Sequence, residues 1–382
     1  MSVLLTGATG FTGSRLLRRL LMTESDDPII VLGRDVPTRL RQRIVAAVEW
    51  VGSGNVLAPN AFSRLRCLQA DLTRPDLGLS PQQRSEITLG VTAVWHCAAA
   101  LSLHRGPAPL YQTNVMGTRR ILQLADLAPE AHLIHISTAY VAGGRRTGCI
   151  LESDLSEASG FQTPYEESKY TAERMVHQWA SSRDRRVTIV RPALLIDDQA
   201  VPAGLPDQPI GVLARFLETL LRQRNSPHTH AGTPASDVKS VHSSSGALWL
   251  RVAGDVEGRL NLLQVDYAVE AMIRAADVPG GPGVRTVHVT HPHNTTFEIL
   301  AQGLEAGCPG LKINFVPELA NPTSLESYVA EEFGHLLGFG AHRRTYDRTN
   351  FLSLVEGLPD PQPIDAAYLA RALPDFDDIL LP

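Results

Sequence analysis

Three glycines in the run Gly7-Ala8-Thr9-Gly10-Phe11-Thr12-Gly13 stand between a short apolar stretch and an amphipathic stretch near the start of the chain. The apolar stretch, Val3 to Leu5, is typical of a buried strand. A glycine turn that leads from a strand into a helix presents the free N–H groups and the positive dipole end of that helix to a pyrophosphate. The run therefore predicts a strand, a phosphate-binding turn and a helix that packs on a parallel sheet.

The helix is expected at Ser14 to Met22, where leucines at positions 16, 17, 20 and 21 form an apolar stripe. Arg15, Arg18 and Arg19 are expected to point mostly outward. Five more short, apolar, β-branched runs follow at intervals that leave room for crossover helices. They are Ile29 to Leu32, Leu65 to Gln69, Ala93 to His96, Leu133 to Ile136 and Val187 to Val190. This order predicts an α/β fold, a doubly wound parallel sheet of the Rossmann type.

Composition excludes several classes of protein. The 382 residues are 43% hydrophobic and 20% charged, which is typical of a globular protein with room for a second lobe. A net charge of -5 argues against nucleic acid as the partner. No apolar stretch approaches the length of a membrane span, and the first strand follows the N-terminus without a charged leader, so a cytoplasmic location is expected. The four cysteines are scattered, as reduced thiols would be.

The regular alternation of strands and helices fades after residue 196. We expect residues 1–196, with returns near 260–290, to form the dinucleotide-binding Rossmann domain, and 197–259 with 291–382 to form a smaller substrate-binding lobe. A helix is expected from Ile210 to Arg224. The polar tract from Asn225 to Gly246 holds His228, His230 and His242 but lacks acidic or cysteine partners, so no metal is assigned. This tract is either a mobile lid or carrier-docking loop, or a dispensable surface insertion.

Tyr165 and Lys169 lie four positions apart in a run that reads as a helix start. Their side chains would share one face, so that the ammonium group lies beside a phenol or a sugar hydroxyl. A tyrosine pKa near ~10 must fall by roughly 3 units, at a cost of about 4 kcal/mol, to exchange protons at neutral pH. A cation ~4 Å away at an effective dielectric of ~20 supplies ~4 kcal/mol. The pair predicts an acid, Tyr165, whose pKa Lys169 lowers; the alternative is an ordinary surface helix.

Residues that follow the other strands are candidates for cofactor contacts. Arg34 follows the second strand, where an NAD enzyme tends to carry an acid, so a 2′-phosphate and hence NADPH is favoured. The later Arg39, Arg41 and Arg43 are equally well explained as a solvated helix face. Asp71 follows the third strand, where it could receive the adenine amine, and small residues around Ala98 leave room for a dinucleotide. A simple strand-end turn is the alternative for both.

The chain resembles the extended short-chain dehydrogenases/reductases, and within them the fatty acyl-CoA reductase and thioester reductase family with its male-sterility-type NAD-binding domain. The resemblance lies in Gly7-x-x-Gly10-x-x-Gly13, Asp71-Leu72, His96-x-Ala98-Ala99, Asn114 to Thr118, Ser137 to Val141, Tyr165-x-x-x-Lys169, Arg191-Pro192 and Asn261 to Val269. It implies Thr138, Tyr165 and Lys169 as catalytic residues. It implies as cofactor contacts Gly7, Thr9, Gly10, Phe11, Gly13, Arg34, Asp71, Leu72, Ala98, Ala99, Asn114, Tyr165, Lys169 and Pro192.

The activity that this resemblance implies is NADPH-dependent reduction of an acyl thioester to an aldehyde and, by a second hydride transfer, to an alcohol. We expect no adenylation or carrier domain before the reductase, and therefore a substrate that arrives as acyl-CoA or on a separate acyl or peptidyl carrier protein. A relative that acts on a nucleotide sugar or on a free ketone or aldehyde would use the same residues. It would need a basic pocket, for which the candidates are Arg215, Arg222, Arg224, Lys239, Arg251 and Arg259. A non-catalytic NADP-binding regulator is the alternative outside enzymes.

Overall fold

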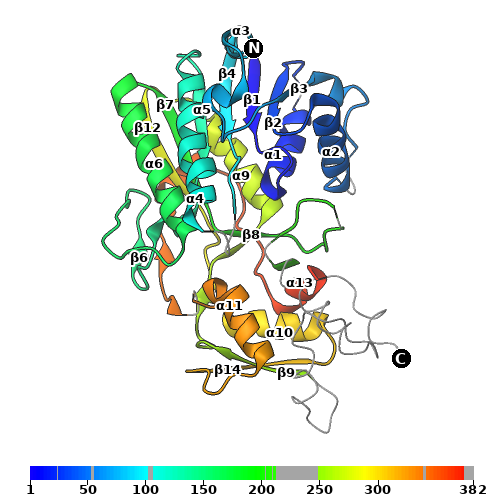
Figure 1. Ribbon diagram of the computed structural model, residues 1–382, viewed down its shortest axis with the longest axis vertical. Coiled ribbons are helices and arrows are strands. Elements are labelled where there is room, and N and C mark those ends of the chain that lie inside the picture. Colours follow the sequence, from blue (N-terminus) through cyan, green and yellow to red (C-terminus); the bar gives the residue numbers. More distant parts are fainter. Residues whose placement is uncertain are drawn as a thin grey trace.

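The computed structural model describes residues 1–23, 25–52, 56–101, 106–202, 204–208, 210–211, 248–338 and 341–373. A seven-stranded sheet dominates it, with every neighbouring pair parallel and the order β12-β7-β5-β4-β1-β2-β3 (Figure 1). The strands are β1 (Ser2–Thr6), β2 (Ile29–Gly33), β3 (Leu65–Gln69), β4 (Val91–His96), β5 (His132–Ile136), β7 (Arg186–Pro192) and β12 (Gly283–Val289). All six predicted strand runs are confirmed, and so is the doubly wound fold.

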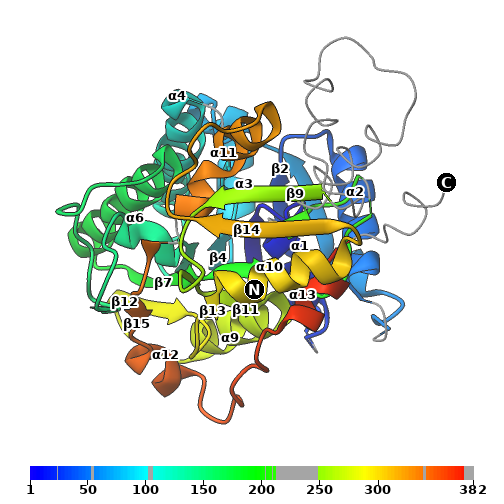
Figure 2. The same ribbon diagram turned by 90° about the horizontal axis from the view of Figure 1, so that it is seen from below.

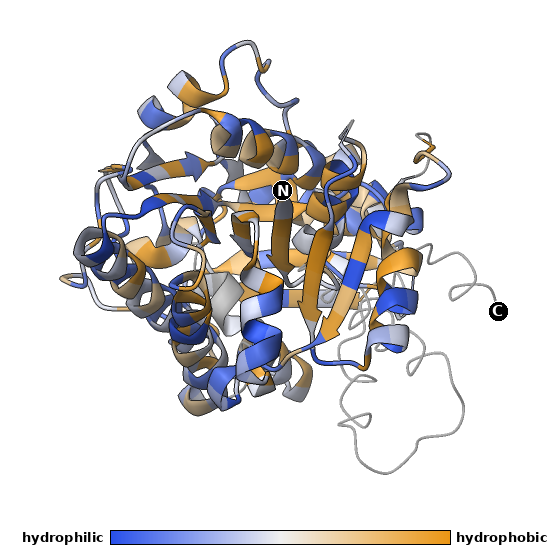
Figure 3. Ribbon diagram, turned by 90° about the horizontal axis from the view of Figure 1, so that it is seen from above, coloured by the Kyte–Doolittle hydropathy of each residue, from blue (hydrophilic) through white to orange (hydrophobic). Residues whose placement is uncertain are grey.

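Helices cover both faces of this sheet because its strands are apolar on both sides (Figure 3). Alternate residues of one strand join different cores: Leu5 of β1 packs with the first two helices, whereas Leu4 faces the opposite layer. One layer contains α1 (Phe11–Leu21), α2 (Pro37–Trp50) and α9 (Val265–Asp277). The other contains α3 (Pro81–Thr88), α5 (Gly117–Ala125) and α6 (Pro164–Arg183). None of the described helices is long and apolar enough to span a membrane.

The arginines of α1 differ from the expectation that they point outward. Arg15 and Arg18 are 3% and 8% exposed. Arg18 donates to the carbonyl oxygen of Val48 at 3.2 Å, and Arg15 pairs with Asp197, far along the chain. Only Arg19 remains substantially exposed, and it pairs with Glu270 of α9. Groups from other elements compensate the charges of Arg15 and Arg18. These elements therefore also cover the face of α1 opposite its leucines.

A smaller lobe lies beyond the carboxyl edge of the large sheet (Figures 1 and 2). Its centre is a parallel pair of strands, β9 (Leu248–Ala253) and β14 (Leu311–Val316). Three helices pack around this pair in one apolar cluster: α10 (Phe297–Gly307), α11 (Ser324–Gly338) and α13 (Ala366–Arg371). Short strands join the lobe to the large sheet: β8 (Leu194–Ile196) pairs with β11 (Leu262–Gln264), and β10 (Arg259–Leu260) with β13 (Thr295–Thr296).

Part of the C-terminal segment returns to the large sheet. β15 (Thr345–Tyr346) pairs with β6 (Cys149–Ile150), and α12 (Thr349–Leu354) packs on β12. The buried Glu152 carboxylate accepts the N–H groups of Asn350 at 2.6 Å and Phe351 at 3.1 Å, which fixes the start of α12. The expectation assigned residues 291–382 as a whole to the smaller lobe, and this segment lies within that range. The expected helix after Ile210 and the Asn225 to Gly246 tract fall, apart from residues 210 and 211, outside the described residues. All four cysteines are free thiols.

Candidate active site and cofactor site

The glycine loop joins β1 to α1 in a space that admits no side chain. Gly7 has a φ of +80°, and a Cβ there would lie 2.6 Å from the backbone nitrogen of Ala98. A Cβ on Gly13 would lie 2.0 Å from the carbonyl oxygen of Gly7. Gly10 precedes α1 in an extended conformation and provides no side-chain cap, which leaves the first N–H groups of α1 to a ligand. This geometry fits the pyrophosphate of a dinucleotide, next to Thr9 and Phe11.

A chain of buried hydrogen bonds fixes the neighbouring end of β4. The N–H of Ala98 donates to Thr6 Oγ1 at 3.2 Å, and Thr6 Oγ1 lies 2.9 Å from His96 Nδ1. Burial lowers the pKa of His96 to about 3, so the ring is neutral and donates through Nε2 to Thr118 Oγ1 at 3.0 Å. The backbone of Ala98 and Ala99 is therefore held beside the glycine loop, where both were predicted to contact a cofactor.

Asn114 joins the end of β4 to α6. It lies in a wide helical turn, Tyr111–Met116, of the kind often found at functional sites. Its side-chain amide accepts the N–H of Ala100 at 2.7 Å and donates to the carbonyl of Ala100 at 3.0 Å. The same amide donates to Ser168 Oγ at 2.9 Å. Through these three hydrogen bonds, Asn114 fixes the distance between the loop after β4 and α6, the helix that carries Tyr165.

The N-terminus of α6 places Tyr165 in its first turn. Thr163 and Glu166 cap this end reciprocally, because Thr163 Oγ1 accepts the N–H of Glu166 at 3.2 Å and the Glu166 carboxylate accepts the N–H of Thr163 at 3.3 Å. One turn later, the buried Lys169 donates from Nζ to the carbonyl oxygen of Ile136, the last residue of β5, at 2.7 Å. The structure thus brings the end of β5 and the start of α6 together.

Thr138 follows β5 at the same edge and is 5% exposed. Its Oγ1 accepts the N–H of Tyr140 at 3.2 Å and so caps a short 3-10 helix, Ala139–Ala142, that packs on α6. Within the described part of the chain, this oxygen acts as a hydrogen-bond acceptor only. The hydroxyl hydrogen of Thr138 is therefore available to an acceptor at this edge of the sheet.

The pKa of Tyr165 differs from the sequence-based expectation. Burial raises it above the ordinary value, and the neighbouring Cys97 thiol and Glu166 carboxyl raise it further. Burial also lowers the pKa of Lys169 to about 8. Lys169 does not lower the pKa of the Tyr165 phenol as expected, because its ammonium group is directed at the Ile136 carbonyl. Burial also disfavours the charged phenolate. Tyr165 consequently keeps its proton at neutral pH and can act as a hydrogen-bond donor.

Arg34 is exposed immediately after β2. The next residue, Asp35, is an acid that the sequence reasoning missed at this position. Its carboxylate pairs with Arg43 and lies 3.8 Å from Arg39, which lowers the pKa of Asp35. Two of the three later arginines are thus paired on α2. Arg34 is left as the cation at the end of the strand.

Asp71 and Leu72 follow β3 in a tight turn. Asp71 Oδ1 accepts the N–H of Thr73 at 2.8 Å and the hydroxyl of Thr73 at 2.7 Å, which is the strand-end turn considered as the alternative. Leu72 packs on α5, where a Cβ on Gly117 would lie 2.9 Å from its own Cβ. Pro192 ends β7 and is buried opposite Val289 of β12. All three therefore have structural roles at the carboxyl edge of the sheet.

A buried ion pair behind the site was missed by the sequence reasoning. Arg191, before Pro192, contacts the Glu173 carboxylate at 2.6 Å, and Ser137 donates to the same carboxylate at 2.5 Å. Burial alone would raise the pKa of Glu173, but Arg191 and these hydrogen bonds lower it to about 2. The signal available in the sequence is the spacing, because Glu173 stands one helical turn after Lys169. The pair anchors the middle of α6 to β5 and β7.

Known proteins resemble this chain in sequence and in fold. The chain is 27% identical over 349 residues to the L-2-aminoadipate reductase large subunit of Penicillium chrysogenum, covering 86% of this chain and 22% of that protein. It is 33% identical over 144 residues to human fatty acyl-CoA reductase 2, covering 36% of this chain and 28% of that protein. The fold matches the crystal structure of the terminal R domain of the myxalamid PKS-NRPS pathway with a TM-score of 0.74, 24% identity, and 97% and 89% of the two chains covered.

The chain thus spans less than a third of the length of these two curated relatives. Residues 5–272, which contain the glycine loop, Thr138, Tyr165 and Lys169, match the male sterility protein family. Because this match covers more than half of the sequence, the chain belongs to the male sterility protein family of NAD-binding domains.

Proposed function

We propose that the protein is an NADPH-dependent reductase that converts an acyl thioester to an aldehyde. The observation that carries this proposal is the placement of two hydroxyl donors, Thr138 and the protonated Tyr165, at the same sheet edge as the glycine loop. Membership of a family whose relatives include named fatty acyl-CoA and aminoadipate reductases supports it.

When bound, NADPH supplies a hydride to the carbonyl carbon of the thioester. Thr138 and Tyr165 donate hydrogen bonds to the carbonyl oxygen as it gains negative charge. Because Tyr165 is buried and retains its proton, its hydrogen bond to an oxyanion is strong and needs little reorganisation. Collapse of the tetrahedral species expels a thiolate, a stable leaving group with a thiol pKa near ~8.5, and leaves the aldehyde.

Of the two tasks expected of Lys169, the contact with a sugar hydroxyl stays in this proposal, and the lowering of the Tyr165 pKa does not. Its ammonium group is fixed to the Ile136 carbonyl, so it adds positive charge at the end of β5. There it would hold the hydroxyls of the nicotinamide ribose and favour the oxyanion nearby. In a second reduction, of aldehyde to alcohol, Tyr165 would give its proton to the alkoxide. Whether one or two reductions occur depends on how long the aldehyde stays bound.

The preference for NADPH rests on Arg34 and on the pairing of Asp35. A free carboxylate after β2 would hold the ribose diol of NADH and repel a 2′-phosphate. Here Asp35 is neutralised by Arg43 and Arg39, and Arg34 is exposed beside it. The local charge is therefore positive, which suits the 2′-phosphate of NADPH.

The substrate would reach the site as acyl-CoA or on a carrier protein, since both present the acyl group on a thioester. The nucleotide-sugar alternative would need a basic pocket. Among the described residues its candidates are Arg251 and Arg259, and Arg251 is paired with Glu326 at 2.7 Å.

The test is consumption of NADPH with a panel of acyl-CoA, acyl-carrier, aldehyde and nucleotide-sugar substrates, with identification of the products. We expect an aldehyde or alcohol from thioesters, and product formation slower by about 10² to 10³ in a Tyr165→Phe variant that still binds NADPH. Turnover of a nucleotide sugar alone would replace this proposal with the alternative.

A further inference from the structure

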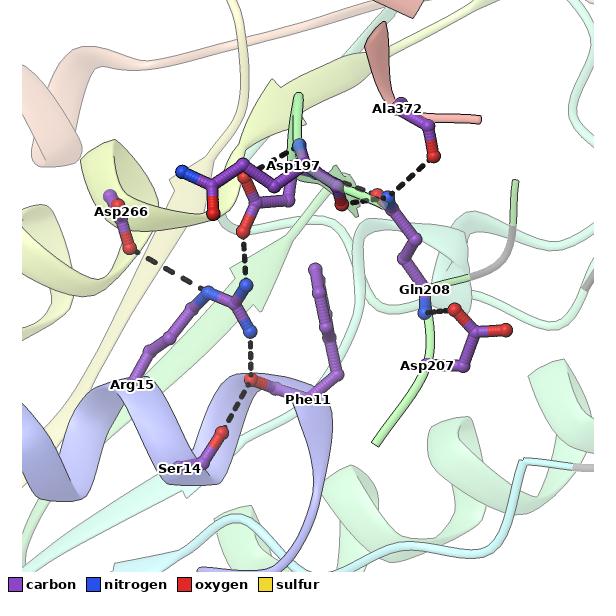
Figure 4. A network of polar contacts seen from close by, with 9 residues as sticks. Phe11, Ser14, Arg15, Asp197, Asp207, Gln208, Asp266 and Ala372 are labelled. Atoms are coloured by element: carbon purple, nitrogen blue, oxygen red, sulfur yellow. Dashed lines mark hydrogen bonds and ion pairs between the residues drawn. The ribbon is translucent and has the colours of Figure 1, made fainter. Parts of the chain in front are cut away.

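Arg15 lies at the centre of a polar network that connects the glycine loop with the smaller lobe (Figure 4). On the loop side, its Nη1 donates to the carbonyl oxygen of Phe11 at 3.1 Å, and its guanidinium lies 4.2 Å from the centre of the Phe11 ring. The ring of Trp50 lies 5.4 Å away. Arg15 is thus tied to the first residue of α1, whose N–H groups lie at the proposed cofactor site.

On the other side, Arg15 binds the chain that leaves the large sheet. Its Nη2 pairs with the carboxylate of Asp197, the residue after β8, and its Nε lies 3.7 Å from Asp266 at the start of α9. Asp197 in turn donates its N–H to Gln208 Oε1 at 2.7 Å. The contact therefore extends from the glycine loop to the segment between residues 197 and 208.

Gln208 carries the connection into the lobe. Its side chain is fully buried, and its Nε2 donates to the carbonyl oxygens of Gln199 at 3.2 Å and Ala372 at 3.4 Å. Ala372 follows α13, whose Arg371 also pairs with Asp198 at 3.3 Å. Cofactor loop, connecting segment and C-terminal helix are thus joined through consecutive contacts.

These contacts leave little freedom for independent movement. A buried guanidinium that loses its carboxylate is costly, because the remaining charge is left uncompensated. The planar group also has fixed donor directions, so a shift of the Phe11 carbonyl must change the direction in which Arg15 meets Asp197. Small shifts at such a junction are passed on as movements of whole segments.

We propose that Arg15 is a positioning residue that couples occupancy of the glycine loop to the placement of residues 197–202, residues 204–208 and α13, so that a bound dinucleotide orders the junction with the smaller lobe. This inference rests on the proposed dinucleotide site and does not depend on the thioester chemistry. It implies that cofactor binds before substrate and prepares the lobe for it.

The test is hydrogen–deuterium exchange of the full chain with and without NADP⁺, which binds without reducing any substrate. In the wild type, NADP⁺ is expected to slow exchange in peptides from the glycine loop. It should also slow exchange by about tenfold, a usual size of coupling between sites, in peptides that contain Asp197, Gln208 or Ala372.

Arg15→Leu and Arg15→Lys should each keep the protection of the glycine loop and lose that of the 197–208 and α13 peptides. Lysine keeps the charge but lacks the planar set of donors, so it separates geometry from charge. Arg19→Leu is the matched control. It removes an ion pair between α1 and α9 one turn further along but does not touch the connecting segment, and the distant protection should persist.

Two results would overturn the inference. One is protection of the glycine loop by NADP⁺ in the wild type without any change at Asp197, Gln208 or Ala372. The other is unchanged distant protection in Arg15→Leu. A protein that passes this test but reduces no thioester would refute the proposed activity and leave the coupling standing.

Discussion

The Arg191 guanidinium contacts the Glu173 carboxylate at 2.6 Å in the interior of the protein, where the two side chains are 1% and 0% exposed. Arg191 belongs to β7 and Glu173 to α6, one turn after Lys169. The pair therefore sets the register of the helix that carries Tyr165 and Lys169 relative to the sheet. We expect the pair to contribute mainly to the position of α6 and little to net stability, because replacing a buried ion pair with apolar residues often leaves stability unchanged.

Removing one partner of this pair has a large expected effect. Glu173→Gln should lower the free energy of unfolding by about 3 to 5 kcal/mol, because Arg191 remains buried without a counter-charge. Urea denaturation of the wild type and the variant measures this loss in the free energy of unfolding. Glu270→Gln is the control, since its partners Arg19 and Arg274 are each 40% exposed, and it should cost at most ~1 kcal/mol. Equal losses in the two variants would contradict this interpretation.

A pH dependence follows from Lys169, whose pKa is lowered by burial to about 8 from an ordinary value of 10.5. Its ammonium form is present below the lowered pKa and is lost as pH rises through it. If that charge holds the cofactor, kcat/KM for NADPH should fall as pH rises above about 8, since this constant reports the free enzyme. Steady-state kinetics across this range measure it. A constant kcat/KM to about pH 9.5 would show that the charge of Lys169 is not needed.

Tyr165→Phe should reduce kcat for a thioester by about 10² to 10³, the loss typical of one oxyanion donor. The dissociation constant for NADPH should change little, because the ring still fills its buried position. Single-turnover kinetics and fluorescence titration separate the two effects. Tyr170→Phe, at a buried tyrosine of the same helix, provides the matched control. Normal turnover in Tyr165→Phe would remove this residue from the chemistry.

Arg34→Ala should weaken NADPH binding by about 1.5 to 3 kcal/mol while leaving NADH binding nearly unchanged, because only NADPH carries the phosphate that Arg34 would meet. Arg39→Ala is a suitable comparison, since Arg39 is 72% exposed and only loosely paired with Asp35. Titration with both cofactors gives the result. Equal affinities of the wild type for NADPH and NADH would refute the proposed preference.

Gly13→Ala tests the close packing of the glycine loop. The added Cβ would lie 2.0 Å from the carbonyl oxygen of Gly7, so the loop must open. We expect NADPH binding to weaken at least about tenfold, or ~1.4 kcal/mol. Gly281→Ala places a methyl group where no atom lies within 4 Å and should bind NADPH normally. Unchanged affinity in Gly13→Ala would mean that the loop does not hold the cofactor.

The strands and the glycine loop were predictable because their signals are local. Val3 to Leu5 and the other apolar runs are contiguous, and the glycines are required by the backbone where they stand. The orientation of Arg15 was not predictable from its neighbours, since hydropathy treats arginine as exposed and its partner Asp197 is 182 positions away.

The sequence indicated which candidate residues meet at the carboxyl edge of the sheet, but not their electrostatics. Spacing identified Tyr165 and Lys169, but the sequence reasoning considered only the charge of Lys169 and not burial, which raises the pKa of Tyr165. Asp35 was not predicted because its pairing with Arg43 depends on the position of α2. Glu173 was not predicted because it lies on α6 and its partner, Arg191, lies on β7.

The position of β12 has a consequence for how the chain folds. β12 forms the edge of the sheet next to β7, and Gly283 pairs with Arg186. During synthesis, the hydrogen-bonding edge of β7 therefore stays unpaired until β12 has left the ribosome. β9 of the smaller lobe and the helix α9 are synthesised before β12. Open edges of this kind pair with other chains. We expect nascent or truncated chains that end before residue 283 to need chaperones and to aggregate, whereas chains that include β12 cover the edge of β7.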